Sequence, residues 1–184
     1  MFIVIKPLYL SNRIINSEFP ANEEIDHIAI ITVVYSGKYF FKNLFVRLSG
    51  IEILTKGLDE LKESYIVYRC SSPQRFQEII NKNNTKRIWI FSHGLKHGVG
   101  FGKEILYYCE VGEQYKETGL PPKEYIKQLH CNHYGGKSLA DYLCDSKEKS
   151  FVTDNTRNVK DNRKYIKEFI QDLKKKRLIE KNNN

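Results

Sequence analysis

Short apolar runs alternate with polar stretches along most of the chain. The run HIAIITVVY at His27–Tyr35 is apolar and β-branched at successive positions, which is typical of a parallel strand buried on both faces. Shorter runs of the same kind recur further along. We therefore predict strands that are neighbours in one mostly parallel sheet, at His27–Tyr35, Tyr65–Tyr68, Arg87–Phe91 and Tyr125–Leu129, with further strands at Phe2–Ile5 and Ser150–Thr153.

Helical signals fall between these runs. Ser72 can cap a helix whose first residue is Pro73. Near the C-terminus, Tyr165, Phe169 and Leu173 recur every four residues, so one stripe of that helix should pack on a core. The predicted helices are Leu58–Glu63, Ser72–Lys82, Ser138–Leu143 and Asn162–Lys176; Lys38–Leu48 fits a strand or a helix, residues 11–24 a loop and Glu104–Val111 a hairpin.

Strands that alternate with helices predict an α/β fold, a three-layer sandwich with a mostly parallel central sheet. The length of 184 residues suits one domain, which we place at residues 1–181, with a frayed tail at 182–184. In such sheets, sites form at the carboxyl ends of the strands. His93 and Cys131 each follow a predicted strand, so any chemistry is expected to centre on them.

The charge and the cysteines indicate which partners and which cellular compartment to expect. Of the net charge of +8, residues 147–184 contribute +6, which suggests weak contact with nucleic acid or an acidic surface, or simply a solvated face. No apolar run approaches the ~20 residues that cross a membrane, and the N-terminus does not resemble a signal peptide. We expect a cytoplasmic protein with no membrane partner, whose four cysteines are thiols.

The segments IWIFSHG and IKQLHCN carry the strongest chemical signal. Each is an apolar strand that ends in a reactive side chain, His93 in the first and Cys131 in the second. A thiol attacks as its thiolate, so it needs a nearby base or positive field. Gly94 has no Cβ, which lets the backbone approach a substrate closely.

A His-Gly after one strand, a Cys after a following strand, a glycine-containing turn and a short helix resemble the caspase-like cysteine peptidases of clan CD, especially the bacterial CHAT branch. The resembling region is Arg87–Leu143, under a third of the chain. The resemblance implies a caspase-like fold, with Cys131 as the thiol nucleophile and His93 as the catalytic base or acid. It also implies that the backbone N–H groups of Gly94 and Cys131 form the oxyanion site.

Other chemistries fit the sequence less well. His93, His97, His130, Cys131 and His133 are all metal-ligand types, but their spacing is poor for zinc, so we expect no metal and no cofactor. The glycines at 98, 100 and 102 lack the dinucleotide-binding spacing, and Ser92 lacks the serine-hydrolase elbow. A flexible loop beside the site explains these glycines better.

Structural roles for the same residues stay open. Cys131 suits a buried thiol, and His93 suits a histidine that hydrogen-bonds a loop carbonyl. Cys70, Cys109 and Cys144 are interpreted as packing residues. The sequence therefore favours a cysteine peptidase (a hydrolase acting on a protein or peptide, with an activating partner left open), or an inactive relative. The alternative is a non-catalytic basic domain that binds nucleic acid or a protein, such as a defence-system accessory.

Overall fold

The centre of the molecule is one mixed sheet. The computed structural model describes residues 13–15, 24–35, 40–95, 97–131, 136–153 and 158–182. Within them, six strands lie in the order β1-β3-β2-β4-β8-β9. All but β1 are parallel to their neighbours, so the predicted α/β class and the predicted parallel neighbours are confirmed. The strands are β1 (Arg13–Ile15), β2 (Ile28–Val33), β3 (Tyr65–Cys70), β4 (Arg87–Phe91), β8 (Tyr125–Cys131) and β9 (Phe151–Thr153).

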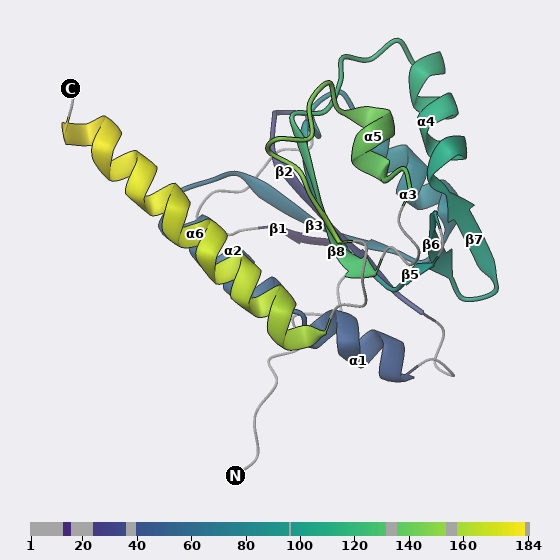
Figure 1. The fold of residues 1–184 in the computed structure, drawn as a ribbon, viewed down its shortest axis with the longest axis horizontal. Helices are drawn as coiled ribbons and strands as arrows, with labels where there is room; N and C mark the ends of the chain where they lie inside the picture. The colour runs from purple at the N-terminus through teal and green to yellow at the C-terminus, as the bar shows by residue number, and fades with distance from the viewer. Residues whose placement is uncertain are drawn as a thin grey trace.

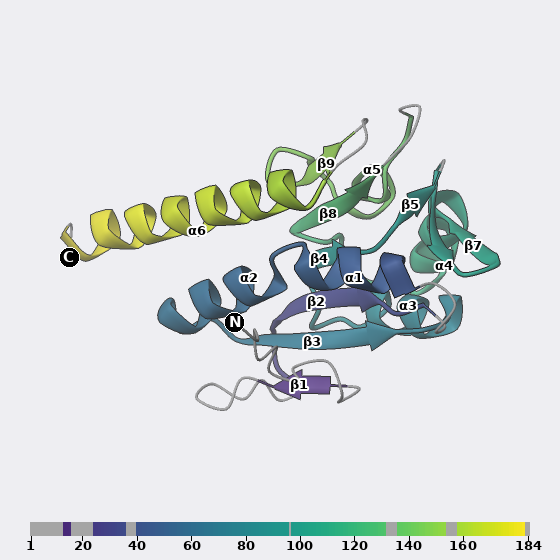
Figure 2. The same cartoon turned by 90° about the horizontal axis from the view of Figure 1, so that it is seen from below.

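Helices cover both faces of this sheet (Figures 1 and 2). One face carries α1 (Phe40–Leu48), α2 (Ile51–Glu60) and α6 (Val159–Asn182), and α6 runs on past the edge of the sheet. The other face carries α3 (Pro73–Ile80), α4 (Tyr108–Glu117) and α5 (Leu139–Leu143). This arrangement is consistent with a three-layer sandwich. Among the described residues, no helix combines the length and the apolar character needed to cross a membrane.

Burial in the core explains why the strands could be predicted from their apolar sequences. Every residue of β2 is buried, and Trp89 of β4 lies edge-on against Phe169 of α6 with 4.9 Å between ring centroids. Ser72 caps α3 as predicted, because its side chain accepts a hydrogen bond from the Arg75 backbone at 3.3 Å. The predicted short helix at 138–143 and the strand at 150–153 are also present as α5 and β9.

Several predicted boundaries were wrong. The short strand β1 lies inside the predicted loop at 11–24, and α2 starts at Ile51 rather than Leu58. The segment that fitted either a strand or a helix is α1. Of the predicted hairpin at Glu104–Val111 only the first part is a strand, because α4 begins at Tyr108. The predicted strand Phe2–Ile5 lies outside the described residues.

A second, smaller sheet follows β4. It holds β5 (Gly94–Leu95), β6 (Gly98–Phe101) and β7 (Glu104–Tyr107), all antiparallel. The prediction of a flexible glycine loop here was wrong. A Cβ at Gly98 would lie 2.8 Å from both the Leu106 carbonyl oxygen and Cγ2 of Ile105. The glycine therefore serves close strand pairing rather than mobility.

Candidate functional site

His93 lies just past the carboxyl end of β4, where the chain leaves the central sheet. Its backbone N–H donates a hydrogen bond to the Tyr35 hydroxyl oxygen at 2.9 Å. Its ring packs against Phe45 of α1, with centroids 4.7 Å apart, and edge-on against Tyr35 at 5.8 Å. Residues that follow β2 and residues of α1 therefore position the first predicted site residue.

The surroundings of the His93 ring favour its neutral form. Burial lowers its pKa, the Lys42 ammonium lowers it further, and a hydrogen bond with the Lys42 backbone opposes both. Its Nε2 atom is buried and has no hydrogen-bond partner in the described part of the chain. A neutral imidazole with an unpaired nitrogen is a proton acceptor. The backbone hydrogen bond also agrees with the structural role that the sequence left open.

Cys131 is the last residue of β8, and its backbone pairs with Thr153 of β9. Strands β4 and β8 pair residues that are 38 positions apart, from Arg87 with Tyr125 to Ile90 with Gln128. His93 and Cys131 are also 38 positions apart. The pairing of the two strands ends at Ile90 and Gln128, three residues before His93 and Cys131, so both residues lie near the carboxyl ends of adjacent strands. The side chain of Cys131 is outside the described part of the structure.

The proposed oxyanion donors are only partly placed. Gly94 is the first residue of β5, and it is buried and pairs with Val99 of β6. It follows His93 directly, so its backbone lies at the same edge of the sheet as the end of β8. Their joint role as oxyanion donors stays a prediction.

Gly136 and His97 lie in close contact. Gly136, beyond Cys131 in the chain, has a φ of +97°, and a Cβ there would overlap Cε1 of His97. His97 itself has a φ of +55°, and its carbonyl oxygen accepts a hydrogen bond from the Tyr108 backbone at 2.9 Å. Gly136 is thus packed against His97, and glycine is required at 136.

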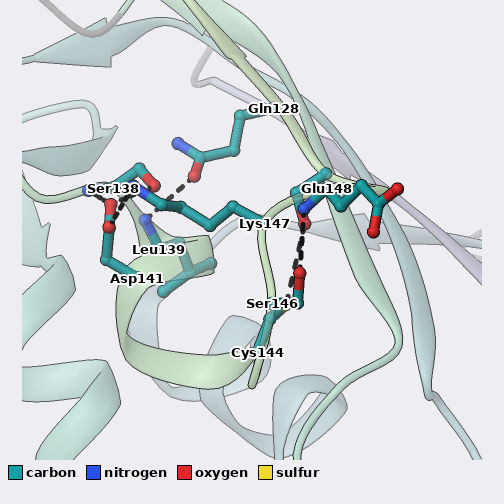
Figure 3. A network of polar contacts seen from close by, with 9 residues as sticks. Gln128, Ser138, Leu139, Asp141, Cys144, Ser146, Lys147 and Glu148 are labelled. Carbon is teal, nitrogen blue, oxygen red and sulfur yellow. Dashed lines mark hydrogen bonds and ion pairs between the residues drawn. The ribbon is translucent and has the colours of Figure 1, made fainter.

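A polar network anchors the chain where it enters α5 (Figure 3). Buried Gln128 of β8 accepts a hydrogen bond from the Leu139 backbone at 2.9 Å, and its amide nitrogen donates to the Tyr108 hydroxyl at 3.3 Å. The Asp141 carboxylate accepts from the backbone and the hydroxyl of Ser138 at 2.6 and 2.7 Å. It also pairs with Lys147 at 2.5 Å. These bonds tie α5 to the strand that ends in Cys131.

Asp141 is ionised in this network. Burial raises the pKa of its carboxyl group, but hydrogen bonds from Lys147 and Ser138 outweigh burial and bring the pKa below its usual value. The carboxylate faces a hollow of about 330 Å³ between α5 and β9, lined by Gly136, Ser138, Asp141, Lys147, Ser150 and Val152.

Sequence reasoning missed several of these residues. Tyr35 was included in a strand and Phe45 in an unassigned segment, and neither had a sequence signal that linked it to His93. Gln128 did have one, because it is a polar residue inside an apolar strand. The spacing of Ser138 and Asp141 is that of a capping box, which was also readable.

The other histidines considered as metal ligands are His97, His130 and His133. His130 is buried, 3.4 Å from the Gln128 amide, and its ring lies 6.3 Å from that of Tyr108. His97 lies against Gly136, and His133 is outside the described residues. Within the described ranges, no three side chains of His, Cys, Asp or Glu are grouped so that they could hold a metal ion.

The other cysteines differ among themselves. Cys70 is fully buried, and burial raises its thiol pKa to about 12. Cys144 is half-buried, and burial also raises its pKa. Cys109 is exposed, so its interpretation as a packing residue was wrong. It lies in the first turn of α4, on the helix face that points to water.

Comparison of the chain with protein-family models and with curated proteins finds no match to either. The resemblance to caspase-like peptidases therefore stays an expectation from the short sequence motifs around His93 and Cys131.

Proposed function

We propose that this chain is a caspase-like cysteine peptidase of three-layer architecture, with Cys131 as nucleophile and His93 as its proton acceptor and donor. The observation that carries the proposal is the shared register. His93 comes two residues after β4, and Cys131 is the last residue of the adjacent parallel strand β8. They are separated by the same 38 positions by which the two strands pair from Arg87–Tyr125 to Ile90–Gln128. Carboxyl ends of neighbouring strands are where α/β folds build their sites.

The proposed reaction is hydrolysis of a peptide bond. The Cys131 thiol gives its proton to Nε2 of His93, and the sulfur attacks the amide carbonyl carbon. The carbonyl oxygen becomes an oxyanion, to which the N–H groups of Gly94 and Cys131 donate. His93 then protonates the departing amine as the C–N bond breaks, which leaves a thioester. Water hydrolyses the thioester to a carboxylic acid and restores the thiol.

The environment of His93 supports its role. A base must be unprotonated before it can act, and burial lowers the pKa of the imidazole, which favours the unprotonated form. Its buried Nε2 atom has no partner among the described residues. A buried acceptor without a partner costs about 1–3 kcal/mol, and a thiol hydrogen would remove part of that cost.

The first test measures alkylation of the four cysteines by iodoacetamide at pH 7, mapped by mass spectrometry. Cys131 should react faster than Cys109, which is exposed and serves as the internal control. His93→Ala should slow Cys131 and leave Cys109 unchanged, because the imidazole acts on one thiol only. If Cys131 is the slowest of the four, it is a packing residue and the proposal fails.

A second test looks for cleavage in a proteome-derived peptide library. Products should form with the wild-type chain and with Cys109→Ser, and disappear with Cys131→Ala. Fast alkylation of Cys131 without any cleavage would instead identify an inactive relative with an intact site.

A basic binding domain is the second candidate, favoured by the lysines of α6. Lys164 and Lys175 have side chains 76% and 75% exposed. Each of these two lysines lies 3.9 Å from a carboxylate of α6 itself, Glu168 and Asp172 respectively. Three further cations of this helix pair with acidic residues on α2 or just after it, as Arg163–Glu52, Lys174–Glu60 and Arg177–Glu63. Any nucleic-acid binding should therefore be weak and lost as salt rises. Sequence-selective binding that survives high salt would favour this candidate over the peptidase.

A further inference from the structure

A buried lysine, Lys127, lies toward the amino end of β8, whereas the candidate site lies at the carboxyl end of the same strand. Lys127 is only 7% exposed. Its ammonium nitrogen lies over three aromatic rings, 5.3 Å from Tyr125, 5.7 Å from Tyr165 and 5.2 Å from Phe169. Two of these rings belong to α6, so this helix closes over the lysine.

The same lysine faces open space. A cavity of about 520 Å³ between α6 and the starts of β2, β4 and β8 is lined by Lys127 together with Tyr125, Phe169 and Leu173. That volume is in the range of small-molecule sites. Within the described residues, the contacts of the ammonium group are with aromatic rings, and no carboxylate is within ion-pair distance of it.

The charged groups around the cavity are mixed. Four carboxylates line it, from Glu63, Glu124, Glu148 and Asp172. Glu63 is occupied by Arg87 at 3.2 Å and by Arg177 at 2.5 Å. Three cations, Arg87, Lys149 and Lys176, share the lining. Burial lowers the pKa of Lys127 to about 8, and the Lys176 ammonium lowers it in the same direction.

We propose that Lys127 is a nucleophilic lysine, and that the cavity beside it binds a small aldehyde or ketone that condenses with its amine. The neutral amine adds to the carbonyl carbon to give a carbinolamine. Loss of water, which takes the carbonyl oxygen and both amine hydrogens, leaves an imine. Desolvation and a second cation nearby are the conditions that activate lysines for this chemistry.

Lys123 provides a comparison within the same chain. It is 3% exposed, and burial lowers its pKa to about 8 as well. Its ammonium, however, donates to the Lys82 carbonyl oxygen at 2.9 Å and to the Thr85 hydroxyl at 3.2 Å. Lys123 is not among the residues that line the cavity. A lowered pKa alone would make both lysines reactive, whereas an open cavity and an unbonded amine single out Lys127.

The test treats the full-length protein with pyridoxal 5′-phosphate at pH 7.5, traps imines with borohydride and maps all lysines by mass spectrometry. With a pKa of about 8, roughly a quarter of Lys127 is unprotonated at that pH, against about one part in a thousand for an ordinary lysine. Labelling of Lys127 should exceed that of exposed lysines at least ~10-fold. Labelling of Lys123 should stay at or below theirs.

Two variants complete the test. Lys127→Met keeps the length of the side chain and Lys127→Arg keeps its charge, and each should remove the labelled site without new labelling elsewhere. Labelling of Lys127 at the level of exposed lysines, or equal labelling of Lys123, would overturn the proposal. Because that comparison is made within the wild-type chain, it holds even if a variant fails to fold. None of these readouts depends on Cys131.

Discussion

Replacing Tyr35 with Phe removes one oxygen atom from the chain that follows β2. That oxygen accepts the hydrogen bond from the His93 backbone at 2.9 Å. The Tyr35 side chain is buried, and burial raises its pKa to about 12, so the hydroxyl stays protonated at any working pH. The ring itself, which packs edge-on against the imidazole, is preserved in the variant.

The expected cost follows from the N–H group left behind. This hydrogen bond is part-buried, and losing a typical intramolecular hydrogen bond costs about 0.5–1.5 kcal/mol. For a domain of this size, each kcal/mol lowers the melting temperature by about 2–4 °C. Tyr35→Phe should therefore lower the free energy of unfolding by about 0.5–1.5 kcal/mol. It should also loosen His93, because one of the contacts that fix its backbone is gone.

Urea unfolding and the alkylation rate of Cys131 measure these two effects. The matched control is Tyr65→Phe. Tyr65 is equally buried, but its hydroxyl donates to the Asp59 carboxylate at 3.0 Å, at the other end of the sheet. Asp59 retains access to water, so the control should cost about 0.5–1.5 kcal/mol. It should leave Cys131 reactivity unchanged.

Two results would refute this reasoning. If Tyr35→Phe is as stable as the wild-type chain, the His93 N–H finds another acceptor and Tyr35 does not hold the site. If both variants slow Cys131 equally, the effect reflects a general loss of stability rather than the placement of His93.

Two further predictions concern the same edge of the sheet. Gly136→Ala should destabilise the fold by about 1–3 kcal/mol in urea unfolding, because the φ of residue 136 is positive and the new Cβ meets the His97 side chain. Adding His97→Ala to the same chain should recover part of the lost stability. If the double variant recovers none, the clash with His97 is not the cause. The ring protons of His93 should titrate in NMR with a midpoint below 6.5, since burial and Lys42 lower its pKa. The stability gained from a neutral His93 is then present above pH 6.5 and is lost as pH falls through the folded-state pKa. A midpoint at or above 6.5 would contradict the buried placement.

The helices that sequence reasoning misplaced share one feature. Both α2 and α4 contain an internal glycine, at Gly57 and Gly112, and glycine weakens a helix by about 1 kcal/mol relative to alanine. A Cβ at Gly57 would lie 2.6 Å from Ile170 of α6, and one at Gly112 would lie 2.8 Å from Tyr142 of α5. Each glycine therefore permits two helices to approach closely. Local propensity cannot show this, because the reason lies in a distant part of the chain.

The sequence by itself determined the buried strands, the cap of α3 and the positions of His93 and Cys131 near the carboxyl ends of strands. These are local consequences of burial on both faces and of turn chemistry, so one stretch of chain is enough to show them. Tertiary structure alone decided the order of the strands, the 38-residue offset between β4 and β8, and the placement of Tyr35 and α1 around His93. It also decided that α6 closes over Lys127, which the sequence shows only as one lysine in an apolar strand. Strand order and helix docking depend on contacts between segments far apart in sequence, and no single segment encodes them.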